Sequence, residues 1–317
     1  NYYEPVSLMA KWFPSECSSL NRKYSFYNRF CVQLGYSQKD LRKKYLTPLR
    51  QYINIVERIL SSKDYDKLNK KYLSQIPSRA MHKLKKALTR HSPEWEEYIS
   101  SLKKGETKVN TGALFPHEII EKIINGSYNN YSCNNYRDSW GGEGVWGDIA
   151  NNSEYDLIRA QWKQMIHDLR NKLEQNGVSF KKTLALSDTS GSMNGVPMNV
   201  SIAMGLIISS LTSEEFLDLI VTFESNPHFI QIPDSEDDII TAVRFMCDQN
   251  KFSWGGSTNF SAVFTKLLKY AKEYRYPDCH EKYGGKVGLV QEDMVERLFV
   301  FSDMQFDEAD NGNFHTN

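Results

Sequence analysis

The sequence predicts two fold classes in succession: an N-terminal helical region, and then a doubly wound, Rossmann-like α/β domain. Apolar residues recur at helical spacing in the first part, whereas short apolar strands alternate with helices in the second. The charge divides at the same place. Lys+Arg against Asp+Glu is 23 against 12 (+11) for residues 1–126, and 16 against 27 (−11) for the remainder. We therefore expect two domains with different tasks.

Composition bounds the class of protein. The chain has 317 residues, of which 40% are hydrophobic and 25% charged, as is typical of globular domains. No run approaches the roughly 18 apolar residues of a membrane span, and no signal-peptide pattern opens the chain. The five cysteines are scattered and form no C-x-x-C pair, and the seven histidines show no zinc spacing. We therefore predict a reducing, cytoplasmic location without a disulfide framework.

Residues 1–126 are predicted to form a basic helical scaffold. The apolar pattern over 41–60 predicts a helix with Asp40 as its N-cap, which Pro48 must bend or split. Ser92 followed by Pro93 is typical of another helix start, and 81–88 and 116–124 predict two more helices. The succession suggests a helical repeat, although no clean period is present.

A linker is predicted over residues 127–152, where Asn, Gly and Tyr are abundant and Trp140 and Trp146 could anchor it. The α/β domain follows over 153–317. We expect strands 183–186, 217–223 and 297–301 to be adjacent and parallel, with 228–232 antiparallel at the edge. The predicted helices are 154–175, 198–211, 235–247 and 260–274, with a polar insertion over 275–293.

Oxygen-bearing side chains follow three of these segments. Asp188, Ser190 and Ser192 form D-x-S-x-S after the first strand, Thr258 lies in "KFSWGGSTNF", and Asp303 follows the last strand. Ligands of parallel sheets bind at the carboxyl ends of the strands, where these loops are expected to meet. Hydroxyl and carboxylate oxygens suit a hard divalent cation. The loop that carries Asp188 is expected to face solvent. The alternative to a metal site is an ordinary polar loop.

This set resembles the metal-ion-dependent adhesion site of von Willebrand factor A domains. The resemblance implies that Asp188, Ser190, Ser192, Thr258 and Asp303 hold Mg²⁺, or Mn²⁺ or Ca²⁺, with one position open. An acidic side chain of a protein ligand would complete the shell. An A domain usually has six strands, whereas four are predicted here, so this domain is expected to be C-terminally incomplete.

A wider resemblance rests on "VSLMAKWFPS", "GALFPHEII", "QWKQMIHDL", "DTSGSMNGVPM" and "LFVFSDMQFD". Together these segments resemble a family of uncharacterised plant and giant-virus proteins that join a helical region to a C-terminal A domain. That architecture is similar to the Ro (TROVE) ribonucleoproteins. It implies a single-stranded or structured non-coding RNA as a partner, and a place in the virion if the source is a giant virus.

Two basic clusters could contact RNA, and tyrosines between them could stack on bases. The candidate residues are Arg42, Lys43, Lys44, Arg50, Lys83, Lys85, Lys86 and Arg90, with Tyr45, Tyr52 and Tyr72 as stacking candidates. The alternatives are a solvated helix face with tyrosines in the core, or docking of the basic part on the acidic half of the chain.

Catalysis is not expected. The sequence has no G-x-x-x-x-G-K-[ST] phosphate loop, no G-x-S-x-G elbow, and no histidine placed by sequence to activate Ser190 or Ser192. The sequence therefore favours a non-enzymatic binding protein, with a Ro-like RNA-binding role. The alternative is a protein-interaction adaptor with Mg²⁺-dependent ligand capture and no RNA role.

Overall fold

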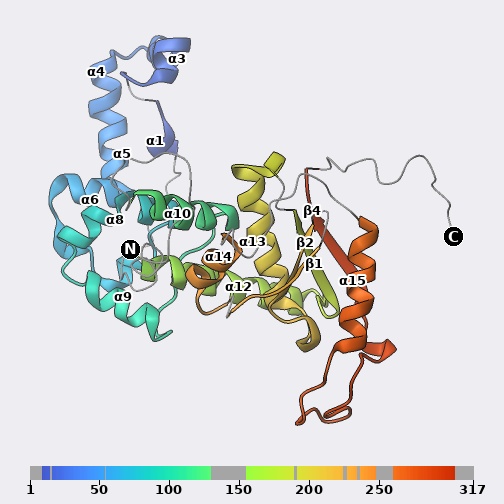
Figure 1. Ribbon diagram of the computed structural model, residues 1–317. Coiled ribbons are helices and arrows are strands. Elements are labelled where there is room, and N and C mark those ends of the chain that lie inside the picture. Colours follow the sequence, from blue (N-terminus) through green and yellow to red (C-terminus); the bar gives the residue numbers. More distant parts are fainter. Residues whose placement is uncertain are drawn as a thin grey trace, which may run out of the picture. The chain divides into compact units, whose positions relative to one another are not determined.

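The computed structural model describes residues 9–14, 16–53, 55–129, 155–188, 191–223, 227–233, 236–247 and 260–303. The chain divides into two compact units, Asn1–Ser101 and Leu102–Asn317, whose elements Figure 1 labels. The unit with the sheet therefore begins earlier than the predicted boundary at residue 126. Most of the predicted linker, including Trp140 and Trp146, lies outside the described residues.

The described part of the first unit is helical, as predicted. Its elements are α1 (Met9–Trp12), α2 (Ser19–Tyr24), α3 (Phe26–Leu34), α4 (Gln38–Leu41), the π-helical turn η1 (Arg42–Leu46), α5 (Thr47–Tyr52), α6 (Val56–Ser62), the 3₁₀ turn η2 (Tyr65–Lys67), α7 (Lys70–Leu73) and α8 (Ser78–His91), with α9 (Trp95–Lys103) at the boundary. Phe13, Tyr27, Cys31, Leu41 and Leu46 form a small core beneath the first of these helices.

The helix predicted over 41–60 is interrupted. Ser37 rather than Asp40 is the N-cap, because its hydroxyl accepts the amide of Asp40 at 3.1 Å. Pro48 can neither donate to the carbonyl four residues earlier nor pack against it, and the preceding turn widens into η1. The helix ends at Tyr52 and α6 begins at Val56. Ser92 closes α8, and its hydroxyl donates to the carbonyl of Leu68 at 2.7 Å.

The second unit contains a mixed four-stranded sheet. Its helices are α10 (Pro116–Asn129), α12 (Asp156–Gln175), α13 (Val196–Leu211), α14 (Ile239–Cys247) and α15 (Phe260–Glu273), with 3₁₀ turns η4 (Gly191–Met193), η5 (Glu214–Phe216) and η6 (Gln291–Asp293). Its strands are β1 (Thr183–Asp188), β2 (Leu219–Phe223), β3 (Phe229–Gln231) and β4 (Arg297–Phe301). The strand order is β3-β2-β1-β4, with β1 parallel to β2 and β4 and with β3 antiparallel to β2. The predicted strand arrangement is confirmed.

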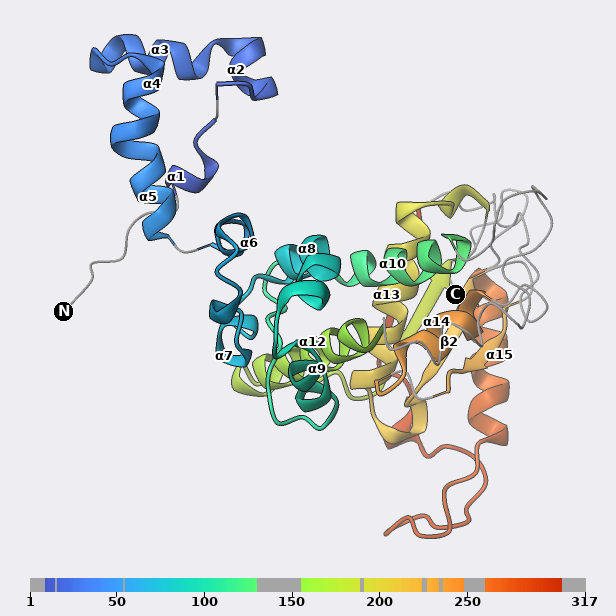
Figure 2. The ribbon, with the colours of Figure 1, turned by 90° about the vertical axis from the view of Figure 1, so that its left-hand side faces the viewer.

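Helices cover both faces of the sheet. One face packs against α10, α12, α13 and α14, around a core that includes Trp162, Leu206 and Ile220. The other face packs against α15, where Leu184 and Leu186 of β1 meet Val263 and Leu267. Figures 1 and 2 show α10 beside α13, so the helix predicted at 116–124 belongs to this core. Among the described helices, none is long and apolar enough to cross a membrane.

A seam of small residues lets α13 lie close to β1. Gly205 faces Ser187, and a Cβ added to Gly205 would lie 2.5 Å from the Ser187 Oγ. The Ser187 hydroxyl donates to the carbonyl of Ser201 at 3.3 Å, and the Ser201 hydroxyl donates to the carbonyl of Phe301, also at 3.3 Å. The seam therefore joins α13 to the end of β1 and to the end of β4.

The predicted polar insertion between α15 and β4 is an ordered loop. Tyr276 is buried, and its hydroxyl donates to Asp293 at 2.6 Å and accepts the amide of Val290 at 3.1 Å. The His280 Nδ1 accepts the amides of Lys282 and Tyr283. The cysteine beside it, Cys279, is an exposed free thiol.

Substituting Gly205 with alanine tests the seam. The new Cβ must displace the Ser187 Oγ, so Gly205→Ala should lower the free energy of unfolding by about 1–3 kcal/mol. The double variant with Ser187→Ala removes the clashing oxygen and should recover much of that loss. Urea denaturation of the wild type, the two single variants and the double variant measures this recovery. Strictly additive effects would show that the two residues do not meet as described.

Candidate functional site

Asp188 stands at the carboxyl end of the central strand and is fully buried. It is paired with Phe223 of β2 on one side, in register with the parallel ladder. On the other side, its Oδ2 accepts the hydroxyl of Ser302 at 2.6 Å. The prediction of a solvent-facing loop is therefore wrong at this residue, because strand pairing carries β1 through to Asp188.

Asp303 reaches the same edge from β4. The register pairs Ser187 with Phe301, so Ser302 and Asp303 continue beyond the paired residues beside Asp188. Asp303 is half-buried, as is Ser302. Two carboxylates thus follow adjacent parallel strands at their carboxyl ends, as the sequence predicted for Asp188 and Asp303.

The turn after β1 is held at its far end by the core. Met193 is 3% exposed and packs with α13 residues, whereas its neighbour Ser192 is exposed. Gly195 has φ +90°, a conformation that L side chains rarely adopt, and it leads directly into α13. Burial of Asp188 and Met193 on either side therefore fixes both ends of this short turn.

Ser190 and Thr258 lie outside the described residues, so their places in a site stay predictions. The described groups are of the types that a hard cation binds: Asp188 is a buried carboxylate at the end of β1, Asp303 is a second carboxylate just beyond β4, and Ser192 is an exposed hydroxyl in η4. Removing an ionised carboxylate from water costs free energy, and hydroxyl donors or a bound cation can offset that cost. Sequence reasoning missed Ser302. Its position directly after the last strand and before Asp303 could have indicated that it lies beside Asp188.

Six of the eight basic candidates are exposed, namely Arg42, Lys43, Lys44, Lys83, Lys86 and Arg90. The last three share one face of α8, since they lie three and four residues apart. Tyr45 and Tyr52 are 43% and 46% exposed. These rings and cations offer the donors and stacking surfaces that single-stranded RNA uses.

The remaining candidates have structural neighbours. Arg50 donates through Nε to the carbonyl of Ala10 at 2.8 Å, and through Nη2 to that of Phe13 at 3.0 Å. Lys85 is half-buried on a different side of α8. Tyr72 is also half-buried, and burial, with Glu57 nearby, raises its pKa to about 12. A charge count cannot separate such residues from exposed ones.

Comparisons with known proteins give two consecutive family matches. Residues 28–174 match DUF2828 and residues 182–317 match DUF7788, each described as a domain of unknown function. The chain is 29% identical over 321 residues to "Uncharacterized protein L728" of Acanthamoeba polyphaga mimivirus. That match covers 96% of this chain and 47% of the viral protein, so the chain spans about half the relative's length. No solved structure matches.

The predicted relation to uncharacterised giant-virus proteins is therefore confirmed. The two family matches meet between α12 and β1, so that the α/β strand succession falls in the second match. The contact division lies earlier, between Ser101 and Leu102. Helices α10 and α12 thus lie in the first match while packing on the sheet of the second.

Removing the Ser302 hydroxyl tests how the carboxylate is held. Because Ser302→Ala leaves the buried Asp188 with one donor fewer, it should lower the free energy of unfolding by about 1–3 kcal/mol. The measurement is chemical denaturation in EDTA, which excludes any contribution from a divalent cation. Ser61→Ala, which removes an exposed helix hydroxyl, is the control and should change stability by about 0.5 kcal/mol or less. Equal effects of the two changes would contradict this role.

Proposed function

We propose that the protein is a non-enzymatic binding protein whose sheet edge is a metal-ion-dependent adhesion site of the von Willebrand factor A type. Asp188, Ser190, Ser192, Thr258 and Asp303 would hold Mg²⁺, or Mn²⁺ or Ca²⁺ in its place. The observation that carries the proposal is that Asp188 ends one strand and Asp303 follows the carboxyl end of its parallel neighbour, where Ser302 donates to Asp188. An acidic side chain of a partner would be the ligand.

The residue types favour recognition. When bound, Mg²⁺ supplies an electrophilic position that an outside carboxylate can occupy. Asp188 is oriented by Ser302, and Ser192 is exposed on the turn that Met193 anchors. Hydroxyl ligands are neutral, so a site rich in them keeps more of the cation's charge for a partner than one built from carboxylates.

Hydrolysis is less well supported. Ser302 donates its proton to a carboxylate, which is a weak base compared with the imidazole that usually activates a serine. The Ser302 hydroxyl also has a structural role, since it serves the buried end of β1. Asp188 and Ser302 are therefore better understood as a positioning pair than as a nucleophile and its base.

RNA binding by the helical unit is a second proposed function, and the resemblance to Ro ribonucleoproteins supports it. Residues 1–101 carry 19 Lys+Arg and 9 Asp+Glu, a balance of +10. Exposed Lys83, Lys86 and Arg90 form one basic face, exposed Tyr45 lies within the basic turn η1, and exposed Tyr52 ends α5. The alternative remains an adaptor that captures an acidic protein and binds no RNA.

The metal proposal is tested by calorimetric Mg²⁺ titration. Asp188→Asn preserves the buried shape while removing the charge, and it should abolish Mg²⁺ binding. Thr258→Ala should weaken capture of an acidic peptide more than it weakens metal retention. Glu292→Gln is the control, because it neutralises an exposed carboxylate of η6, before β4 begins. Mg²⁺ binding that survives in Asp188→Asn, or peptide capture unchanged by EDTA, would refute the proposal.

The RNA proposal predicts binding that falls steeply with salt, because each neutralised phosphate releases counterions. Reversing the exposed Lys43, Lys44, Lys83 and Lys86 to Glu should abolish binding of a single-stranded RNA in fluorescence anisotropy. Reversal of Lys269, Lys272, Lys282 and Lys286 in the acidic unit matches the charge change and should leave most of the affinity. If both reversals act alike, the helical face is not the RNA site, and the adaptor function is favoured.

A further inference from the structure

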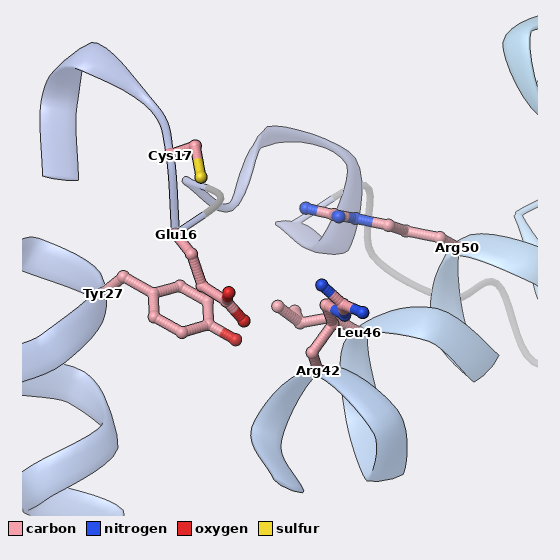
Figure 3. A pocket seen from close by; sticks show the side chains of 6 residues that line it. All are labelled: Glu16, Cys17, Tyr27, Arg42, Leu46 and Arg50. Atoms are coloured by element: carbon pink, nitrogen blue, oxygen red, sulfur yellow. The ribbon is translucent and has the colours of Figure 1, made fainter. Parts of the chain in front are cut away.

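The helical unit contains a pocket of about 110 Å³ that the RNA-binding faces do not explain. Its lining residues are Glu16, Cys17, Tyr27, Arg42, Leu46 and Arg50 (Figure 3). Tyr27 and Leu46 are buried in the small core and give the pocket an apolar floor. Charged groups stand around it: the Glu16 carboxylate and the Tyr27 hydroxyl face the two guanidinium groups across the pocket.

The two arginines reach the pocket from one continuous helical stretch. Arg42 and Leu46 begin and end the π-helical turn η1, and Arg50 follows one turn later in α5. The widened turn is marked by the amide of Thr47, which bonds to the carbonyl of Arg42. Such π turns occur often at functional sites. Here the turn sets two guanidinium groups on the same side as the buried Leu46.

Arg50 is fixed before any ligand arrives. It uses two of its five N–H groups on the carbonyls of Ala10, in α1, and Phe13, directly after α1. The remaining N–H groups are held in place without a further ordering cost. Arg42 is exposed, and its side chain forms no hydrogen bond or ion pair with the described residues. A fixed guanidinium from Arg50 and an adaptable one from Arg42 suit an oxyanion, because two oxyanion oxygens can accept paired hydrogen bonds from one planar guanidinium group.

Glu16 narrows the class of ligand. Its carboxylate likewise forms no hydrogen bond or ion pair with the described residues, although both guanidinium groups are nearby. Burial raises the pKa of Tyr27, and Cys31 and Glu16 raise it further, whereas Arg42 and Arg50 lower it. The charges of Glu16 and the two arginines therefore act on one group, the Tyr27 hydroxyl. A bare anion would be repelled by Glu16. A ligand with an anionic group and a neighbouring hydroxyl would be favoured, because the arginines would bind the anionic group and Glu16 would accept the hydroxyl.

We propose that this pocket binds the phosphate and adjoining ribose of a nucleotide. Arg42 and Arg50 would take the phosphate oxygens, and Glu16 would accept a ribose hydroxyl, as acidic side chains do in dinucleotide sites. A free nucleotide and the end of an RNA strand can both supply this group. The RNA source rests on the proposed function, whereas the pocket itself does not.

Calorimetry with ribose 5-phosphate and with inorganic phosphate tests the pocket directly. Arg42→Gln should weaken ribose 5-phosphate binding about tenfold or more, because a charge-assisted contact is lost. Glu16→Gln should weaken ribose 5-phosphate binding, because a neutral amide is a weaker acceptor of the ribose hydroxyl than a carboxylate. It should strengthen inorganic phosphate binding, because it removes a repelling charge. Lys39→Gln, which removes an exposed cation of α4 shortly before the same turn, is the control and should change neither by more than about twofold.

Absence of ribose 5-phosphate binding, or an effect of Arg42→Gln no larger than that of Lys39→Gln, would refute the proposal that this pocket binds the phosphate and ribose of a nucleotide. If Glu16→Gln changed the affinities for ribose 5-phosphate and inorganic phosphate equally, the proposed contact between Glu16 and the ribose would be refuted. The two sources are separated by comparing a mononucleotide with RNA carrying a 5′-phosphate or a 5′-hydroxyl. Mononucleotide binding without RNA binding would support the pocket while refuting the proposed RNA function.

Discussion

Burial of β1 on both faces is the constraint on which the second unit depends. All six of its residues are buried, and its backbone pairs with β2 on one side and with β4 on the other. A strand so enclosed requires small neighbours where a helix crosses it closely, and Ser187, Ser201 and Gly205 supply them. The same enclosure carries a carboxylate, Asp188, into the interior at the strand's end.

That carboxylate links stability to the proposed site. An ionised group removed from water must be compensated by donors or by a cation, and Ser302 supplies one donor from the adjacent strand. The β1–β4 pairing sets the distance between Asp188 and Ser302, and Ser201 ties the end of β4 to α13. The groups that would position a metal ligand are therefore also groups that hold the sheet together. A substitution at this edge changes both properties, so shape-preserving variants are needed to separate them.

The sequence predicted the sheet better than the helical unit, and the reason is physical. Strands such as β4 are short apolar runs bounded by polar residues, and the predicted range of β4, 297–301, matches the structure. Strand β1 extends two residues past its apolar run because backbone pairing continues through Ser187 and Asp188. Amphipathic spacing identified α10 but could not say which surface its apolar side would cover, and this surface is the α/β core. The N-cap at Ser37 and the widened turn before Pro48 depend on local geometry that spacing does not encode.

Charge counting failed in an instructive way at Arg50. The residue contributes to the basic balance of the helical unit, yet two carbonyls of the α1 region hold it in place. Lys43, seven residues earlier, contributes the same charge from an exposed position. A loose cation favours encounter with any polyanion, whereas a held guanidinium can select a ligand by shape. The proposed metal site and the proposed pocket would both recognise anionic oxygen, the metal site through a metal cation and the pocket through guanidinium groups. EDTA should abolish ligand binding only at the metal site, and loss of Arg42 should weaken ligand binding only at the pocket. The two sites of a chain with no net charge can therefore be measured independently.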